Sequence, residues 1–181
     1  FLYVRADYTV DSGEKVSKTS STYNDTLFVE GFGQVKEYEV KLYSVDRNEN
    51  VSAPVVQVIT PLEANTNTVA ATLTVRPGFS ALIAEWTNEL QQTVDVYVRL
   101  SDGETVAEKV LSSNSKDGFF LVENLQNKDY TVSTYVKDQY GNISSVQDCG
   151  ILRPLEDAPL NKSLWAFLPN QQLYGNRWNY D

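Results

Sequence analysis

The sequence contains no histidine and no methionine, and Cys149 is the single cysteine among its 181 residues. Without histidine there is no Ser-His-Asp triad, no histidine-ligated metal and no imidazole acid–base catalyst. Cys149 has no histidine to activate it as a papain-like nucleophile, and without a second cysteine it forms no intramolecular disulfide. A buried free thiol is therefore the interpretation that we favour for Cys149.

The chain also lacks long apolar runs and clusters of basic residues. No apolar run approaches the roughly 20 residues that a membrane-spanning helix requires. The 15 Lys and Arg residues are scattered singly and are outnumbered by 24 Asp and Glu residues, for a net charge of −9. Nucleic acid binding requires clustered positive charge, so we exclude nucleic acid as a partner. The carboxylates offer no privileged pair of glycosidase type, and we predict a protein that is not an enzyme and needs no cofactor.

The most informative feature that is present is an internal repeat. At an offset of 92 residues, the first copy has Tyr38-x-Val40, Asp46 and Asn50-Val51-Ser52, and the second has Tyr130-x-Val132, Asp138 and Asn142-Ile143-Ser144. At an offset of 93, Pro61-Leu62-Glu63 matches Pro154-Leu155-Glu156; at 94, Tyr3-Val4-Arg5 matches Tyr97-Val98-Arg99. The small change in the offset, from 92 to 94 residues, indicates short loop insertions between two copies of one folding unit.

Hydrophobic alternation predicts strands in both copies. In the first copy we expect five strands, at residues 2–10, 14–22, 26–32, 37–46 and 51–60. In the second we expect seven, because residues 69–75 and 80–86 add two strands with no counterpart before Leu2. Residues 65–67 are expected to form a polar link, and no long helix is expected before residue 158.

The D-x-N-x-N spacing of Asp46–Asn50 imitates the start of a calcium-binding loop. The segment lacks the central glycine and the glutamate at the twelfth position that complete such a loop. Its second copy, Asp138–Asn142, also loses the middle ligand. We therefore expect no metal site. A hairpin in which Asp and Asn side chains bond the backbone of their own turn explains both copies.

Seven short strands in about 90 residues are typical of an antiparallel β-sandwich. The order of Trp86, Tyr97-Val98-Arg99, Leu125 with Tyr130 and the 138–144 hairpin resembles that of fibronectin type III modules. The resemblance covers residues 1–157 and implies an all-β chain of tandem antiparallel β-sandwiches of fibronectin type III/immunoglobulin-like type. No cysteine pair flanks Trp86, which disfavours the antibody type.

The resemblance also implies a tyrosine corner, in which a phenol hydroxyl bonds backbone and fixes the crossover between the sheets. The spacing from Leu125 to Tyr130 has this form. In the first copy the pair is Phe32 and Tyr38, one residue longer. We expect Trp86 to lie in the core with Val98, Val122, Leu125, Tyr130 and Val132.

We divide the chain into a first module at residues 1–62, a complete second module at 63–157, and a linker or start of a further domain at 158–181. The first module lacks its first two strands, which would leave Leu2, Val4 and Leu42 facing water. We expect this face to be completed by upstream residues, or covered by a neighbouring copy or by the tail. Phe1 in place of an initiator methionine predicts that the chain belongs to a longer polypeptide.

The tail at residues 158–181 places aromatic residues among Asn, Gln and Pro. Paired type III-like modules followed by such a segment are similar to surface lipoproteins of glycan-foraging gut bacteria, in which a discoidin-like domain comes next. This resemblance implies an extracytoplasmic location, at the cell surface or in the periplasm, and a glycan or another surface protein as partner. Trp165, Tyr174 and Trp178 are the candidate carbohydrate-binding residues, because aromatic rings stack on sugar faces. Packing within an adjoining domain is the alternative role.

The function that we favour is a non-catalytic extracytoplasmic binding or spacer protein, built from tandem fibronectin type III-like modules as part of a larger cell-surface protein. One alternative is a carbohydrate-binding surface protein that uses the tail aromatics. Another is an accessory region of a glycoside hydrolase whose catalytic part lies elsewhere. The ligand, the anchoring mode and the oligomeric state are not determined by the sequence.

Overall fold

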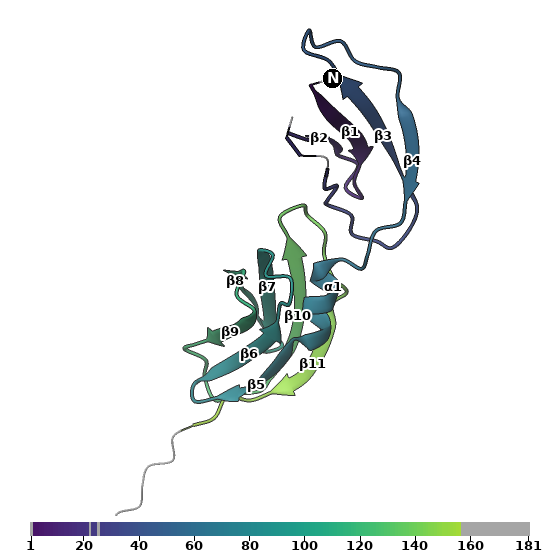
Figure 1. Ribbon diagram of the computed structural model, residues 1–181. Coiled ribbons are helices and arrows are strands. Elements are labelled where there is room, and N and C mark those ends of the chain that lie inside the picture. The colour runs from purple at the N-terminus through teal and green to yellow at the C-terminus, as the bar shows by residue number, and fades with distance from the viewer. Residues whose placement is uncertain (1, 22, 25, 157–181) are drawn as a thin grey trace, which may run out of the picture.

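The computed structural model describes residues 2–21, 23–24 and 26–156, which form two β modules arranged end to end (Figure 1). Within these residues the only helix is a short one, and every other regular element is a strand. The strands form three sheets, and each strand pairs antiparallel with its neighbours. The predicted all-β fold class of fibronectin type III-like modules is confirmed.

The second module has seven strands and the helix. Their bounds are α1 (Asn65–Thr72), β5 (Thr74–Gly78), β6 (Ala81–Thr87), β7 (Val94–Ser101), β8 (Val106–Ser113), β9 (Asp117–Val122), β10 (Tyr130–Asp138) and β11 (Gln147–Leu152). One sheet has the order β11-β10-β7-β8 and the other the order β5-β6-β9. Three strands thus pack against four, as in a fibronectin type III-like sandwich.

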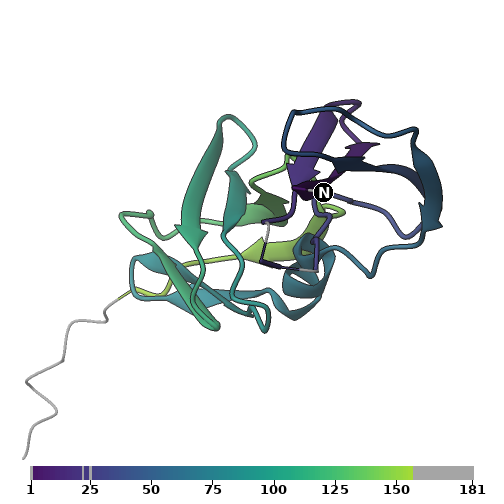
Figure 2. The same cartoon turned by 45° about the horizontal axis from the view of Figure 1, so that its top comes forward.

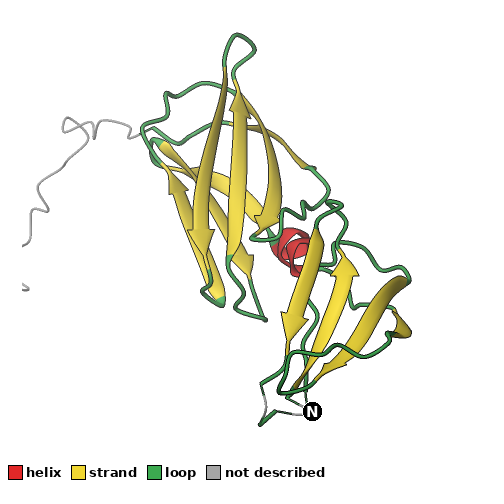
Figure 3. Cartoon of the chain, turned by 90° about the horizontal axis from the view of Figure 1, so that it is seen from above, coloured by secondary structure: helices red, strands yellow, loops and turns green. Residues whose placement is uncertain are grey.

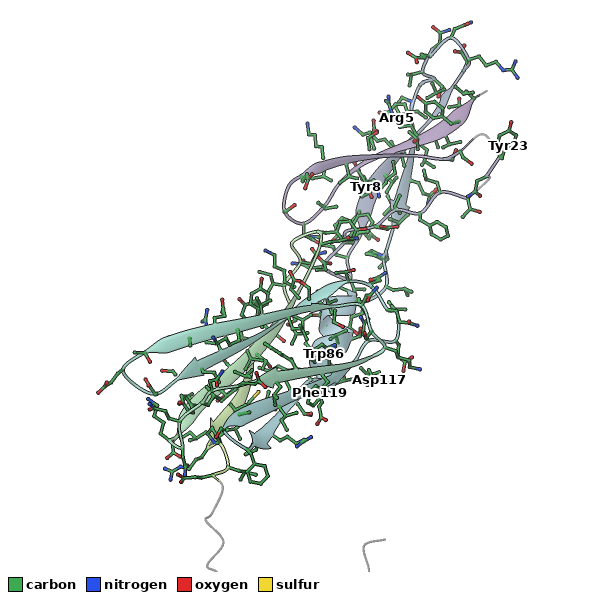
Figure 4. All side chains as sticks on the ribbon, turned by 90° about the vertical axis from the view of Figure 1, so that its left-hand side faces the viewer. Arg5, Tyr8, Tyr23, Trp86, Asp117 and Phe119 are labelled. Carbon is green, nitrogen blue, oxygen red and sulfur yellow. The ribbon has the colours of Figure 1, made fainter. Side chains whose placement is uncertain are left out.

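The core of the second module lies between these two sheets. Alternate side chains of β6, β7 and β10 are buried, as a strand with one face inward requires. The predicted core is confirmed: no more than 8% of the surface is exposed at Trp86, Val98, Val122, Tyr130 and Val132. Leu125 is half-buried and packs against them. Figure 4 shows Trp86 inside this module.

The helix α1 was not expected from the sequence. Residues 65–67, predicted as a polar link, form its first turn, and residues 69–72, predicted as part of a strand, complete it. No side chain caps the helix and its first turn has no acidic residue, so the usual start signals are missing, and its threonines favour strands. Val69 and Ala70 are buried where α1 packs against β6 and β10. Tertiary packing therefore outweighs the local preference.

In the part of the first module that the structure describes, the strands form a single sheet. Its strands are β1 (Tyr3–Thr9), β2 (Lys15–Thr19), β3 (Tyr38–Val45) and β4 (Val55–Ile59), in the order β2-β1-β3-β4. In the same order, these strands correspond to β8, β7, β10 and β11 of the second module. The prediction of a fifth strand at residues 26–32 is wrong, because this segment forms no strand ladder. In the second module the equivalent strand, β9, pairs with β6, and the first module has no element equivalent to β6 among its described residues.

Residues 26–32 nevertheless lie against the sheet of the first module. The Tyr8 hydroxyl donates to the carbonyl oxygen of Glu30 at 3.0 Å and accepts from the Glu30 N–H at 3.1 Å. The Phe32 ring packs between the Tyr8 and Tyr38 rings, with centroids 5.2 and 4.4 Å away. Leu27 and Val29 pack against the same cluster. The segment thus covers one end of the sheet without joining it through backbone pairing.

The strand registers correct one part of the repeat alignment. Arg5 pairs with Tyr43 across β1 and β3, whereas Tyr97 pairs with Tyr135 across β7 and β10. Tyr43 and Tyr135 are 92 residues apart, so Arg5 is equivalent to Tyr97 and the β1–β7 offset is also 92. The alignment of Tyr3-Val4-Arg5 at an offset of 94 is therefore wrong. A shift of two residues leaves every side chain on the same face, so the hydrophobic pattern alone does not detect it.

We predict that Gly118→Ala destabilises the second module. A Cβ atom at this position would overlap the Trp86 ring, which lies directly over the glycine. Because the Trp86 ring is buried, the expected loss is about 1–3 kcal/mol in the free energy of unfolding, measured by denaturant titration.

The matched control removes the ring. Trp86→Leu is destabilising by itself, but Gly118→Ala should add little to it if the overlap is the cause. Additive losses in the double variant would contradict this account of Gly118.

Candidate functional site

The three residues predicted to bind carbohydrate, Trp165, Tyr174 and Trp178, lie outside the described residues. Their role stays a prediction. Among residues 2–21, 23–24 and 26–156, no group of three or more Cys, Asp or Glu side chains is placed to hold a metal ion. Within the same residues, no helix is long and apolar enough to cross a membrane.

The hairpin after β3 is held by the carboxylate of Asp46. One carboxylate oxygen accepts from the backbone N–H groups of Asn48 at 2.8 Å and Asn50 at 2.9 Å. The other accepts from Nδ2 of Asn50 at 2.9 Å. These hydrogen bonds, those from Asn50 first, lower the pKa of Asp46. At the hairpin base, the Ser52 hydroxyl accepts from the Ser44 N–H at 3.0 Å.

The hairpin after β10 repeats these bonds one for one. Asp138 accepts from the N–H groups of Tyr140 and Asn142, each at 2.9 Å, and from Nδ2 of Asn142 at 2.8 Å. The Ser144 hydroxyl accepts from the Val136 N–H at 3.0 Å. Since each aspartate is occupied by its own turn, the interpretation of both copies as self-bonded hairpins is confirmed.

The two hairpins differ at the residue that requires a left-handed backbone. Gly141 has a φ of 86° in the second hairpin, and the equivalent Glu49 has a φ of 63° in the first. Glycine adopts this conformation without a steric penalty, whereas a residue with a Cβ does not. The first hairpin is therefore the more strained of the two.

The second hairpin contacts the first module. Nδ2 of Asn142, which already donates to Asp138, also donates to the carbonyl oxygen of Gly31 at 3.1 Å. The Tyr140 hydroxyl donates to the carboxylate of Glu30. Burial, followed by this hydrogen bond, raises the pKa of Tyr140. Figure 2 shows the loop after β10 beside the first module.

Two glycines of the first module make this contact fit. Gly31 has a φ of 96°, and a Cβ there would lie 3.3 Å from the Tyr140 ring. At Gly33 a Cβ would lie 2.5 Å from Oδ1 of Asn142. The junction therefore depends on backbone without side chains at both positions. A groove runs beside it, lined by residues 28–32, 59, 61–65, 90–93 and 138–140.

The outer face of the first sheet carries a second groove, shallow and polar. The Arg5 guanidinium lies 4.7 Å from the centroid of the Tyr43 ring and 3.2 Å from the Asp7 carboxylate. On the equivalent face of the second module, Tyr97 and Tyr135 stack with centroids 4.5 Å apart. The outer face of each module thus carries a tyrosine ring in contact with another group, which is the Arg5 guanidinium in the first module and a second tyrosine ring in the second.

The tyrosine corner is found in the first module and not in the second. The Tyr38 hydroxyl donates to the carboxylate of Asp11 at 2.7 Å and to the carbonyl oxygen of Gln34 at 3.3 Å. No hydrogen bond is formed by the Tyr130 hydroxyl among the described residues, so the predicted corner there is wrong. Instead, the Lys128 ammonium lies 5.6 Å from the Tyr130 ring centroid.

Asp11 is the acceptor on which this corner depends. Besides Tyr38, it accepts from Nζ of Lys36 at 2.6 Å and from the Gly33 N–H at 2.7 Å. Burial acts to raise the pKa of Asp11, but hydrogen bonds from Lys36, Tyr38 and Gly33 outweigh it and lower the pKa. Asp11 therefore connects the core tyrosine to the glycine that faces the second module.

Cys149 is a free cysteine on β11 and is half-buried rather than fully buried as predicted. Its Sγ lies 3.7 Å from the hydroxyl of Thr134, and it packs against the core of the second module. These surroundings are those of a structural thiol.

Comparison with family models identifies the second module. The model described as "Domain of unknown function (DUF5126)" matches residues 62–163, more than half of the chain. The chain belongs to the DUF5126 family. A second model, described as "Domain of unknown function (DUF4959)", matches residues 1–61, so a DUF4959 module precedes the DUF5126 module. No curated protein matches the chain in sequence.

Several solved structures are similar to this DUF5126 chain. A SusE-like protein is 19% identical with a TM-score of 0.44, covering 55% of this chain and 35% of its own. A two-domain fibronectin type III segment of chicken tenascin is 17% identical with a TM-score of 0.42, covering 84% and 85%. The FN1–FN3 domains of chicken CNTN1 are 14% identical with a TM-score of 0.39, covering 84% and 56%. The chain spans about a third of the SusE-like protein's length.

Sequence reasoning did not find the junction residues of this DUF5126 protein. The signal was present as Gly31-Phe32-Gly33, two glycines flanking a core aromatic. Glycine at such a position indicates a close approach of another group. The group that approaches is Asn142, more than 100 residues away in sequence, and a local pattern does not show this.

We predict that Glu49→Gly stabilises the first module. The substitution removes a left-handed non-glycine residue, and the expected net gain is about 0.5–1 kcal/mol in the free energy of unfolding. Thermal or denaturant unfolding measures it. The corresponding substitution in the DUF5126 module, Gly141→Ala, should lower the free energy of unfolding. If both substitutions changed the free energy of unfolding equally and in the same direction, the strain at Glu49 would be refuted.

We also predict that the two repeated tyrosines respond differently to loss of their hydroxyl groups. Tyr38→Phe removes a donor from the half-buried Asp11 carboxylate and should cost about 1–2 kcal/mol. Tyr130→Phe, the matched control, should change stability by less than about 0.5 kcal/mol. Denaturant titration followed by module-specific fluorescence or NMR signals measures both, and a Tyr130→Phe loss as large as that of Tyr38→Phe would contradict the hydrogen bonding described.

Proposed function

We propose that this chain is a non-catalytic, extracytoplasmic spacer and binding protein whose two modules hold a neighbouring part of a larger surface protein at a set distance. The observation that carries the proposal is the junction between Asn142 and Gly31. A spacer requires its modules to keep their relative orientation. The contacts described above provide a means of keeping it.

The linker itself leaves little freedom between the modules. β4 ends at Ile59 and α1 begins at Asn65, so five residues connect them. Ala64 and Asn65 are buried, and Nδ2 of Asn65 donates to Oδ1 of the buried Asn88 at 3.0 Å. Figure 3 shows α1 at the end of the second module that meets the first. The linker is therefore tied into the second module as soon as it leaves the first.

A hairpin contact then fixes the other side of the junction. Tyr140 and Asn142 bond to Glu30 and Gly31, on a segment that is itself bonded to Tyr8 in the first module. The modules are thus connected through the linker and through this second contact. Two separated contacts restrict a hinge more than one does.

The extracytoplasmic location and the role in a surface protein rest on the resemblance to surface lipoproteins of gut bacteria. The net charge of −9 supports a solvated exterior rather than a nucleic acid partner. The absence of catalysis rests on the missing histidine and on the self-bonded aspartates.

The test is the distance distribution between spin labels in the two modules. Cys149→Ser removes the native thiol, and Lys15→Cys and Thr105→Cys, both at exposed positions, carry the labels. The spacer role predicts one narrow distance in double electron–electron resonance. Asn142→Ala should broaden the distribution, because it removes the bond to Gly31.

The chain offers a matched control for this test. Asn50→Ala removes the same hairpin bond to Asp46 without touching the other module, so it should leave the distance unchanged. A broad distribution in the parent protein would refute the fixed spacer. A distribution that broadens equally in both variants would refute the role of the junction contact.

Carbohydrate binding through Trp165, Tyr174 and Trp178 is the second candidate function. The composition of residues 158–181 favours it, because aromatic and amide side chains are the groups that sugar sites use. We expect no binding tighter than about millimolar by this chain alone. Isothermal titration against plant and host polysaccharides measures this, and tighter binding that is lost in Trp165→Ala or Trp178→Ala would favour the sugar-binding function instead.

A further inference from the structure

The strand β4 forms an open edge of the first sheet (Figure 1). Its sequence is Val-Val-Gln-Val-Ile, and the exposed fractions of Val55, Val56 and Val58 are 65%, 51% and 49%. An edge strand presents a row of unpaired N–H and C=O groups, so an exposed apolar edge is a place where another strand can pair.

The other edge strands of the described sheets carry features that oppose such pairing. Each contains at least one charged side chain: Lys15 and Lys18 in β2, Arg76 in β5, Glu108 and Lys109 in β8, Asp117 in β9, and Asp148 in β11. In addition, β5 contains Pro77, and β11 has a register shift against β10. Charged residues, prolines and bulges protect edges from pairing with other chains. Among the described edges, β4 alone has none of these features.

The hydrogen bonds of β3 determine which backbone groups of β4 point outward. The Ser52 N–H donates to the carbonyl oxygen of Ser44 at 3.0 Å, so the even-numbered residues of β3 bond toward β4. Their partners in β4 are its odd-numbered residues. The N–H and C=O groups of Val56 and Val58 therefore point away from the sheet. Nε2 of Gln57 donates to the carbonyl oxygen of Val58 at 3.0 Å, which agrees with an outward carbonyl.

The sequence of β4 is symmetric in residue kind about Gln57. When two copies pair antiparallel about a two-fold axis at Gln57, Val56 of each copy lies opposite Val58 of the other. These are the residues with outward groups, so each such pair exchanges two hydrogen bonds. Val55 then lies opposite Ile59, and the two Gln57 amides lie opposite each other. A shift of two residues places the Gln57 amide opposite an apolar side chain, so one register is favoured.

The charges beside β4 also fit a second copy. The net charge of −9 opposes association except where the contacting surfaces are uncharged or complementary. Within one copy, Val58 pairs with Glu39 of β3 and Val56 pairs with Lys41. In the paired sheet, Glu39 of one copy lies in the same row as Lys41 of the other, three strand spacings or about 14 Å away. Charges of opposite sign therefore face each other across an uncharged seam.

We propose that β4 is an interaction surface for a second copy of this chain, and that the two β4 strands pair antiparallel about Gln57. The pairing joins two four-stranded sheets into one continuous sheet. Each copy contributes the same strand, so the interface is isologous and the assembly closes as a dimer. This dimer goes beyond the spacer function and does not depend on it.

Sedimentation equilibrium of the full chain over a concentration series tests the proposal, and the expected result is a reversible dimer. Val58→Pro removes an N–H that points away from β3, so the sheet of its own module keeps its hydrogen bonds. Each dimer loses two hydrogen bonds, and the dimer dissociation constant should rise by about tenfold or more. The matched control is Ile151→Pro at the equivalent outward position of β11, which is 70% exposed. It should leave the dimer unchanged.

Cross-linking tests the register without the proline variants. In a Cys149→Ser chain, Gln57→Cys places two thiols on the two-fold axis at a non-hydrogen-bonded pair. Cα atoms of such a pair are about 4.5 Å apart, within the range of a disulfide, so oxidised glutathione should link the dimer. Val55→Cys is the control, because Val55 lies on the same face and is 65% exposed. Its two copies are about 13 Å apart in this register and should not be linked.

Three results would overturn the proposal. The first is a chain that stays monomeric up to millimolar concentration. The second is a dimer that Val58→Pro and Ile151→Pro weaken equally while circular dichroism shows both variants folded. The third is equal cross-linking of the Gln57→Cys and Val55→Cys chains, which would exclude pairing about Gln57.

Discussion

The apolar face of a β-sheet needs a cover, and the two modules of this chain meet that requirement to different extents. In the second module a three-stranded sheet and α1 close over Val96, Val98 and Val132, which are fully buried. In the first, a single extended segment anchored by Tyr8 and Phe32 covers only one end of the sheet. Among the described residues, the repeat unit thus forms a three-on-four sandwich in the second module and a four-stranded sheet in the first.

The best conserved geometry between the modules lies in the hairpins rather than in the core. Asp46 and Asp138 make the same set of bonds to their own turns, so the conformation of each turn is held by residues within it. This independence leaves Asn142 free to use its second amide hydrogen for Gly31. The hairpin at Asp138–Asn142 therefore also forms the contact between the modules.

Much of this fold was predictable from the sequence. Apolar and polar residues alternate along a strand with one buried face, and the repeat shows most strands of the sheet twice. The core residues around Trp86 and Val132 and the two hairpins followed from this. The helix α1 did not, because packing on β10 determines it against its threonine-rich composition. The prediction of a strand at residues 26–32 followed local propensity. It was wrong because a strand needs a neighbouring strand with which to pair. The contact at Gly33 could not be predicted, since it depends on Asn142, which is far away in sequence.

The hairpin at Asp138–Asn142 has a consequence for how such modules multiply along a chain. In the turn of Asp46–Asn50 the second amide hydrogen of Asn50 has no partner among the described residues, so the same turn can stand alone or form a joint between modules. Formation of the joint involves both sides. Tyr140 stands in the second turn where Asn48 stands in the first, and the receiving segment lacks a side chain where the turn lies, as at Gly33.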